Sequence, residues 1–138
     1  MLKMVGSKLY LGIDPGRSKT GLALVDAQGG ICALKVVFMD DFENALCNFC
    51  TNAALEAIIM GDGTNSKAVS KVVVQNFPDV PFYVVGEAYS TEDARKLYWE
   101  INPPSGFKKL IPLGLLVPNE PLDAYAAVVQ VRRWLNKR

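Results

Sequence analysis

The sequence predicts a single α/β domain built on a mixed five-stranded sheet that is flanked by helices. Three short apolar runs joined by tight turns occupy residues 8–39, and further apolar runs then alternate with stretches of helical periodicity. The chain has 138 residues, of which 50% are hydrophobic, so it can bury one sizeable core but not two. The expected domain therefore spans residues 1–138.

The first three apolar runs predict an antiparallel meander. "KLYLGID" at 8–14 and "TGLALVD" at 20–26 are bounded by glycine and polar turn residues, as strands are. "AQGG" at 27–30 is typical of a hairpin turn, because glycine tolerates positive φ. "ICALKVVFM" at 31–39 is then expected to return as the third strand.

From Asp40 onward the pattern alternates between helices and strands. Ser90 and Asp93 resemble a capping box, which would fix the start of one helix. Alternating strands and helices imply right-handed parallel crossovers, so the meander should continue into parallel strands of the same sheet. The expected elements are a helix from 40, a strand over 56–62, a helix over 65–77, a strand over 82–87 and a helix over 90–101.

The segment 102–118 predicts an apolar loop, because its four prolines and two glycines leave no room for a long regular element. Its part "LIPLGLLVP" at 110–118 either contacts a second copy of the chain in a homodimer or packs over the sheet. Residues 120–138 are expected to form the last helix, with Pro121 in its first turn.

Charge is unevenly distributed along the chain, although the net charge is only +1. Residues 26–62 carry six acidic side chains and one lysine, whereas residues 95–138 carry eight basic and three acidic ones. This asymmetry permits a basic face for a polyanion, and an ordinary solvated C-terminal helix explains it equally well. Charge alone identifies no partner.

Cysteine usage and hydropathy predict a cytoplasmic protein without a membrane span. Cys32, Cys47 and Cys50 form no disulfide framework, and no charged apolar leader is recognised. No run of about 18 apolar residues is present. We expect Cys47 and Cys50 to be small buried hydrophobes rather than zinc ligands, since zinc would need two further ligands.

Carboxylates close two of the predicted strands and open the last helix. Asp14 ends the first strand, Glu87 ends the fifth, and Glu120 and Asp123 share one face of the final helix. Ligands gather at the carboxyl ends of strands in such sheets, so these acids are expected to converge and hold a cation. Oxygen-only ligands favour Mg²⁺ or Mn²⁺. Such ions activate water and bridge phosphate oxygens, which is the chemistry of phosphodiester hydrolysis.

Two further observations bear on this metal site. The chain contains no histidine, which excludes Ser-His and Cys-His nucleophiles and a His-rich zinc site. Each acid also has a simpler structural explanation. Asp14 could be a turn residue before Pro15, and Glu87 and Asp123 stand near helix starts, where the dipole favours acids. Their joint occurrence on these elements favours the metal site.

Three motifs resemble those of the RuvC and YqgF (RuvX) nucleases of the ribonuclease H-like superfamily, over nearly the whole chain. "LGIDPGRSKTGLALVD" is similar to the first motif of these nucleases, with Asp14 and Gly16 matching and Lys19 where the YqgF pattern usually has arginine. "EPLDAYAAVV" is similar to their closing helix, in which Glu120 and Asp123 match the paired acids of RuvC.

The middle motif, "VVGEAYSTEDA", is similar to the second motif of the family. The matching residues in it are Glu87, Ser90, Thr91 and Ala94. The sequence departs from the family pattern at Gly86 and Ala88, which flank Glu87, and at "GDGTNSK" over 61–67.

The resemblance implies a ribonuclease H-like fold and a divalent-metal-dependent endonuclease acting on structured nucleic acid. The substrate would be either a four-way DNA junction or precursor 16S rRNA. It implies Asp14, Glu87 and Asp123 as catalytic residues that hold Mg²⁺ or Mn²⁺, with Glu120 as a fourth carboxylate.

Several other side chains are candidates for contact with nucleic acid. Arg17 and Lys19 are expected to meet phosphates, and Ser90 belongs to the matched middle motif. Thr64 and Asn65 stand at a helix start, where backbone N–H groups can hold a phosphate. The aromatic residues Tyr89, Tyr98 and Trp99 could stack on bases, although aromatic residues on an amphipathic helix more often belong to the core.

Two other function classes remain open at this point. One is a catalytically weak nucleic-acid-binding or scaffold protein on a nuclease fold, because Ala88 stands where the family has arginine. The other, an ATP-dependent kinase or ATPase of the related actin-like architecture, is disfavoured because that architecture uses two such domains and this chain has room for one.

Overall fold

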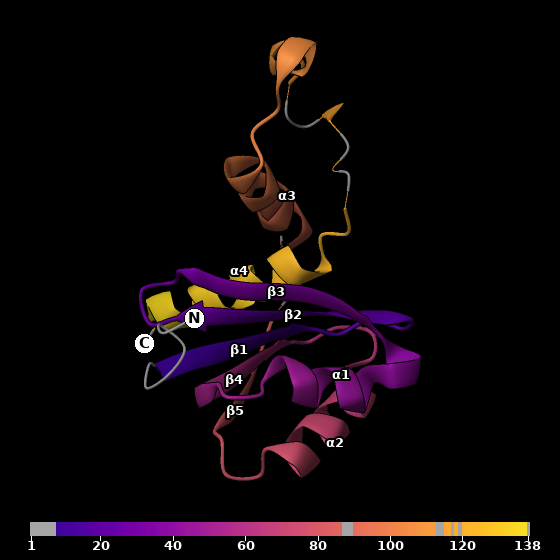
Figure 1. Ribbon diagram of the computed structural model, residues 1–138, viewed down its shortest axis with the longest axis vertical. Coiled ribbons are helices and arrows are strands. Elements are labelled where there is room, and N and C mark those ends of the chain that lie inside the picture. Colours follow the sequence, from indigo (N-terminus) through magenta and orange to yellow (C-terminus); the bar gives the residue numbers. More distant parts are fainter. Residues whose placement is uncertain (1–7, 87–89, 113–114, 117, 119, 138) are drawn as a thin grey trace.

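The fold is a five-stranded mixed sheet between two helical layers (Figure 1). It was established in a computed structural model that describes residues 8–86, 90–112, 115–116, 118 and 120–137. The strand order is β3-β2-β1-β4-β5, with β1, β2 and β3 antiparallel and with β4 and β5 parallel to β1. The predicted sheet is therefore confirmed. The strands are β1 (Lys8–Asp14), β2 (Lys19–Asp26), β3 (Ile31–Phe38), β4 (Ala54–Gly61) and β5 (Phe82–Val85).

The helices divide the core into two clusters, one on each face of the sheet. α1 (Phe42–Phe49) and α2 (Ser66–Asn76) cover one face, α4 (Asp123–Lys137) covers the other, and α3 (Ser90–Ile101) packs against α4 (Figure 1). The strands serve both clusters because successive side chains alternate between faces. In β1, for example, Leu11 and Ile13 belong to the α1 and α2 cluster, whereas Tyr10 belongs to the α3 and α4 cluster.

Small residues let α4 approach the sheet closely. A methyl group placed on Gly12 of β1 would lie 2.4 Å from the carbonyl oxygen of Ala127. No side chain fits in that space, so the helix backbone rests on the strand backbone. α4 begins near the carboxyl end of β1 and ends beside the β2–β3 turn, where Arg132 Nε donates a 2.8 Å hydrogen bond to the carbonyl oxygen of Gly29.

The turns of the meander form as the sequence predicts, each for a local reason. Asp26 Oδ1 accepts hydrogen bonds from the backbone N–H groups of Gln28 and Gly30, and Gly29 has a φ of 86°. Between β1 and β2, Gly16 is needed for space rather than for positive φ. A methyl group there would lie 2.4 Å from the carbonyl oxygen of Lys19.

The last helix starts later than predicted. α4 begins at Asp123, so Glu120 precedes it and does not share a helical face with Asp123. Pro121 keeps Glu120 out of the helix, because a proline disfavours the helical conformation of the residue before it. Within the predicted capping box, the carboxylate of Asp93 accepts a hydrogen bond from Arg133 of α4. The side chain of Ser90 lies outside the described residues.

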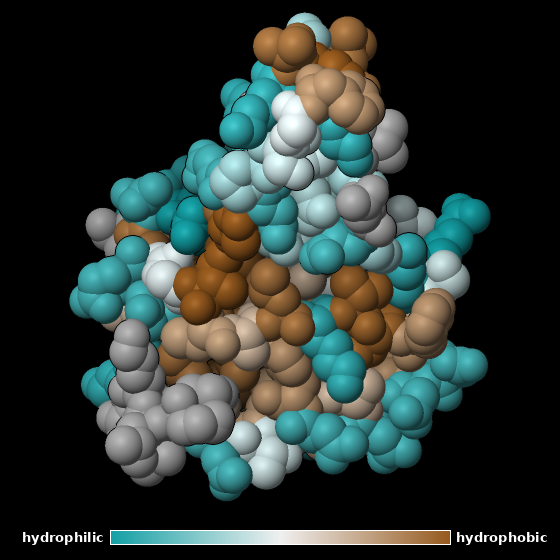
Figure 2. Space-filling model, turned by 45° about the horizontal axis from the view of Figure 1, so that its top comes forward, coloured by the Kyte–Doolittle hydropathy of each residue, from teal (hydrophilic) through white to brown (hydrophobic). Residues whose placement is uncertain are grey.

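The predicted apolar loop over 102–118 contains a short 3-10 helix, η3 (Gly106–Leu110), and projects with α3 away from the sheet (Figure 1). Phe107, Leu110 and Leu115 are 75%, 87% and 74% exposed, whereas Leu116 is buried. Figure 2 shows hydrophobic side chains gathered at this projecting tip. The described part of the loop therefore does not pack over the sheet as a whole. We call Phe107, Leu110 and Leu115 the arm tip.

Of the neighbouring cysteines Cys47 and Cys50, only Cys50 is buried. Cys50 is 6% exposed, and burial raises the pKa of its thiol to about 12. Cys47 is exposed, and its thiol donates a hydrogen bond to Asn76 Oδ1 at 3.3 Å. The expectation that both are buried hydrophobes is correct for Cys50 and wrong for Cys47. Within the described residues, no helix has the length and apolar character to cross a membrane.

Candidate functional site

The carboxyl edge of the sheet brings together three of the predicted site residues. Asp14 ends β1, Lys19 begins β2, and Asp123 is the first residue of α4. Asp14 lies directly opposite Gly21 in the β1–β2 ladder, and Lys19 is two residues before Gly21. Directly opposite residues share a face, as do residues two apart along one strand. Asp14 and Lys19 therefore project from the same face as Gly21.

Gly21 is also the point where α4 touches this face. A methyl group on Gly21 would lie 2.0 Å from the carbonyl oxygen of Asp123 and 2.5 Å from the backbone nitrogen of Ala124. The first turn of α4 thus rests directly on the backbone of β2. Because Gly21 is paired with Asp14, this close approach sets Asp123 beside Asp14.

Lys19 already forms an ion pair at this edge. Its Nζ lies 3.9 Å from Asp123 Oδ2, and the two side chains are 40% and 31% exposed. An exposed pair of this kind contributes only about 0–1 kcal/mol, because water screens it and both side chains lose freedom. A cation or a phosphate can therefore separate Lys19 from Asp123 at little cost.

Glu120 points toward a different partner. It is exposed in the turn before α4, and its Oε1 accepts a 3.0 Å hydrogen bond from the hydroxyl of Tyr125. Asn102 Nδ2 donates to the same hydroxyl at 3.3 Å. Burial raises the pKa of Tyr125, the Asn102 hydrogen bond opposes this, and Glu120 adds to the rise. Glu120 is thus held by Tyr125 in this structure.

The phosphate candidates Arg17, Thr64 and Asn65 lie in loops at the same edge. Arg17 is exposed in the β1–β2 turn, and Thr64 and Asn65 follow β4, which is parallel and adjacent to β1. Asn65 precedes the first residue of α2 and makes no side-chain capping bond to it. Its side chain and the first N–H groups of α2 are therefore placed where a phosphate could be bound.

The remaining predicted site residues are either outside the described residues or part of the core. Glu87 and Tyr89 lie outside the described residues, as does the side chain of Ser90. Tyr98 and Trp99 are 4% and 8% exposed and pack edge-to-face at 4.9 Å. They belong to the core, as expected of aromatic residues on an amphipathic helix.

Phe38 is a further residue of this edge that the sequence reasoning missed. It ends β3, is 67% exposed, and lies directly opposite Lys19 in the β2–β3 ladder. The signal was available, because pairing outward from the "AQGG" turn places Phe38 near Lys19. An apolar residue at the end of an apolar run suggested only core packing.

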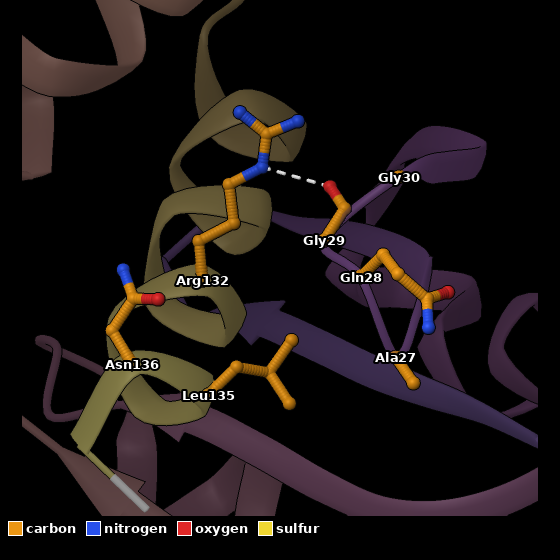
Figure 3. Close-up of a pocket in the computed structure, with 7 residues that line it drawn as sticks. All are labelled: Ala27, Gln28, Gly29, Gly30, Arg132, Leu135 and Asn136. Atoms are coloured by element: carbon orange, nitrogen blue, oxygen red, sulfur yellow. Dashed lines mark hydrogen bonds between the residues drawn. The ribbon is translucent and has the colours of Figure 1, made fainter.

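The basic residues of α4 lie at the other end of the sheet. Arg132 is beside the β2–β3 turn, where a hollow of about 670 Å³ is lined by this turn and the last turns of α4 (Figure 3). Arg133 is paired with Asp93. The basic charge of α4 therefore does not surround Asp14 and Asp123.

The carboxylates at the edge fit a hard divalent cation in donor chemistry. Asp14 and Asp123 supply oxygen ligands on one face. Within the described residues, no three His, Cys, Asp or Glu side chains converge as a metal cage. Mg²⁺ does not require a complete protein cage, because it keeps several waters and is commonly held by one or two carboxylates plus substrate phosphates.

The strand order, the antiparallel meander and the helix laid across Gly12 and Gly21 define a ribonuclease H-like fold. No family model and no curated protein matches the sequence.

Comparison with solved structures finds two that align over 94% of this chain. One is the fowlpox virus resolvase in complex with substrate Holliday junction DNA, with a TM-score of 0.62, 10% identity and 97% of that chain covered. The other is Thermus thermophilus RuvC in complex with a Holliday junction substrate, with a TM-score of 0.60, 16% identity and 96% covered.

A weaker alignment covers 67% of this chain and only 31% of a ROK family transcriptional regulator, with 16% identity and a TM-score of 0.45. This chain thus spans about a third of the length of that protein. At identities of 10% and 16%, the two resolvases share the fold with this chain, and the site residues must be judged on their own geometry.

Proposed function

We propose that this protein is a divalent-metal-dependent endonuclease that hydrolyses phosphodiester bonds in structured nucleic acid. The observation that carries the proposal is the meeting of Asp14 and Asp123 on one face of the sheet, beside Lys19, at the carboxyl edge. Ligands of open α/β sheets bind at this edge. The arrangement pairs anionic metal ligands with a cation that can bind phosphate.

Asp14 and Asp123 would hold the metal, and Glu87 and Glu120 are proposed as additional carboxylates. Glu120 would have to leave the Tyr125 hydroxyl to take part. A bound Mg²⁺ or Mn²⁺ lowers the pKa of water and neutralises charge on the phosphate oxygens. The protein residues fix the geometry, since Gly21 allows Asp123 to lie beside Asp14.

Lys19 and Arg17 would bind the phosphates of the substrate strand. Lys19 lies between Asp123 and the exposed end of β3, so a phosphate bound there would be close to the acids. Thr64 and Asn65 would hold a neighbouring phosphate at the start of α2, and Ser90 is proposed as a further contact. Phosphate contacts of this kind position the strand without reading its bases.

The substrate is proposed to be a four-way DNA junction or precursor 16S rRNA. The two similar resolvase structures contain Holliday junction DNA, which favours the junction. The motifs shared with YqgF proteins favour the precursor rRNA. The experiment is cleavage of both labelled substrates with Mg²⁺, Mn²⁺ or EDTA. Metal-dependent products would support a nuclease and identify its substrate, whereas no cleavage with either metal would contradict it.

A nucleic-acid-binding protein without cleavage activity is the second candidate. The observation that favours it is the ion pair between Lys19 and Asp123, which occupies the carboxylate of Asp123. In that case Lys19 and Asp123 would form a fixed polar surface. Binding of either substrate in EDTA without cleavage in any metal would select this second function.

We also propose that the protein forms a homodimer through the arm tip. Phe107, Leu110 and Leu115 are each at least 74% exposed on one projecting segment. Three large apolar side chains clustered in this way mark a contact more often than scattered ones do. Sedimentation velocity at rising concentration should show a dimer that Leu110→Ser weakens. A monomer at the highest concentration would contradict this.

A further inference from the structure

The backbone of Phe38, whose side chain is exposed, is held in place at the carboxyl edge. Its backbone is extended, with φ −81° and ψ 144°, and it is paired with Lys19 in the β2–β3 ladder. The next residue, Met39, donates its N–H to the carbonyl oxygen of Ser18 at 2.9 Å, and its sulfur lies 3.0 Å from the buried hydroxyl of Thr20. The end of β3 is thus bonded to the β1–β2 turn.

Phe38 projects on the same side of the sheet as the candidate metal ligands. It shares a face with Lys19, which lies directly opposite, and Lys19 shares a face with Gly21 and Asp14. α4 covers this face only from Gly21 onward, because it begins at Asp123. Phe38 pairs with Lys19, which is two residues before Gly21, so α4 does not reach the ring.

The charges around Phe38 restrict what can lie on it. Lys19 is adjacent on one side, with Arg17 exposed in the turn next to it. Asp40 and Asp41 follow Phe38 by two and three residues along the chain, and both are exposed. A phosphate is attracted toward Lys19 and Arg17. The ring beside them suits an uncharged aromatic group attached to that phosphate.

We propose that Phe38 stacks on an unpaired base of the nucleic-acid strand whose phosphate is bound by Lys19. This inference rests on the proposed function, because it takes nucleic acid as the substrate. It adds that the substrate presents an unstacked nucleotide beside the cleaved bond, as the branch point of a junction or an RNA loop can. Stacking on an aromatic side chain strengthens binding by roughly 5- to 150-fold per base.

The test couples removal of the ring with removal of the base. Phe38→Ala, Phe38→Leu and Phe38→Tyr are compared with the wild type on the junction or rRNA fragment, whichever the wild type binds more tightly. Single abasic sites are placed in turn at each nucleotide around the branch point or loop. Affinity is measured by fluorescence anisotropy in EDTA. Val84→Ala is the control, because Val84 is 52% exposed on β5 and faces the opposite side of the sheet.

We expect Phe38→Ala and Phe38→Leu to bind at least about 5-fold more weakly, and Phe38→Tyr and Val84→Ala to bind like the wild type. When the abasic site removes the stacked base, the affinity of the wild type should fall by the same factor. The affinity of Phe38→Ala should not fall further at that position. Equal affinity of Phe38→Ala and wild type on every substrate would overturn the inference. A changed sedimentation coefficient of Phe38→Ala with unchanged affinity would also overturn it, because Phe38 would then contact protein rather than a base.

Parallel cleavage assays in Mg²⁺ and Mn²⁺ separate this inference from the proposed nuclease. Coupling between Phe38 and one base, without any cleavage by the wild type, would support stacking and contradict the nuclease. Cleavage by the wild type, with Phe38→Ala binding normally, would support the nuclease and overturn stacking. No binding of either substrate by the wild type would overturn both.

Discussion

Lys19 is the side chain on which the two candidate functions differ most. Its ion pair with Asp123 is half-exposed and weak, so the ammonium can be transferred to a phosphate without a large loss of stability. If a cation binds Asp14 and Asp123, Lys19 is repelled from them and left facing the substrate. In the proposed function, one residue would thus serve as a counter-ion in the free protein and as a phosphate ligand in the complex.

Lys19→Gln should weaken nucleic-acid binding in a salt-dependent way. Removing one phosphate contact lowers the slope of log affinity against log salt by about one, with the same effect on different sequences. Affinity measured in EDTA over a range of salt concentrations gives this slope. The control is Lys8→Gln, because Lys8 pairs with Glu56 at the start of β1, at the opposite edge. An unchanged slope in Lys19→Gln would exclude Lys19 as a phosphate ligand.

The first turn of α4 is the element that assembles the site. It begins at Asp123, lies on Gly21 of β2, and continues across Gly12 of β1. Because a backbone rather than a side chain occupies the space above each glycine, the helix cannot shift to admit a larger residue without moving Asp123. The glycines of these strands therefore determine how closely the backbone of α4 approaches the strands that carry Asp14 and Lys19.

Gly21→Ala should destabilise the fold and reduce cleavage together. The added methyl group would meet backbone atoms of Asp123 at 2.0 Å, so α4 must move, and overpacking of this kind typically costs about 1–3 kcal/mol. Urea denaturation measures the loss. Gly86→Ala is the stability control, because a methyl group on Gly86 would meet nothing within 4 Å among the described residues beyond its chain neighbours. Equal unfolding midpoints for Gly21→Ala and the wild type would show that α4 does not rest on Gly21.

Among the helices and strands, the sequence predicts the order of elements well and the details of the last helix less well. Alternation and helical periodicity identify all five strands and four helices, because these patterns follow directly from burial. The exclusion of Glu120 from α4 depends on Pro121, and the exposure of Phe38 depends on where α4 begins to cover the sheet. The first is a local steric effect of proline and the second follows from three-dimensional packing, and hydrophobic periodicity contains neither.

The molecule as a whole separates its charges and its apolar surface into different regions. The carboxyl edge holds Asp14, Asp123 and Lys19, while Arg132 lies at the other end of α4 and the arm tip projects beyond the sheet. The meeting of Asp14 and Asp123 was predictable from strand ends and a helix start. The ion pair of Lys19 was not, because nothing in the spacing links it to Asp123.

The central claim, that Asp14 and Asp123 together hold the catalytic metal, is tested most directly by comparing binding and cleavage of one substrate in matched carboxylate variants. The variants are Asp14→Asn, Asp123→Asn and the control Asp79→Asn, whose carboxylate is exposed in the turn before β5. Binding is measured in EDTA and cleavage in Mg²⁺. We expect Asp14→Asn and Asp123→Asn each to lose cleavage by about 100-fold or more while binding at least as tightly as the wild type. Asp79→Asn should behave like the wild type, and full cleavage by Asp14→Asn would contradict the claim.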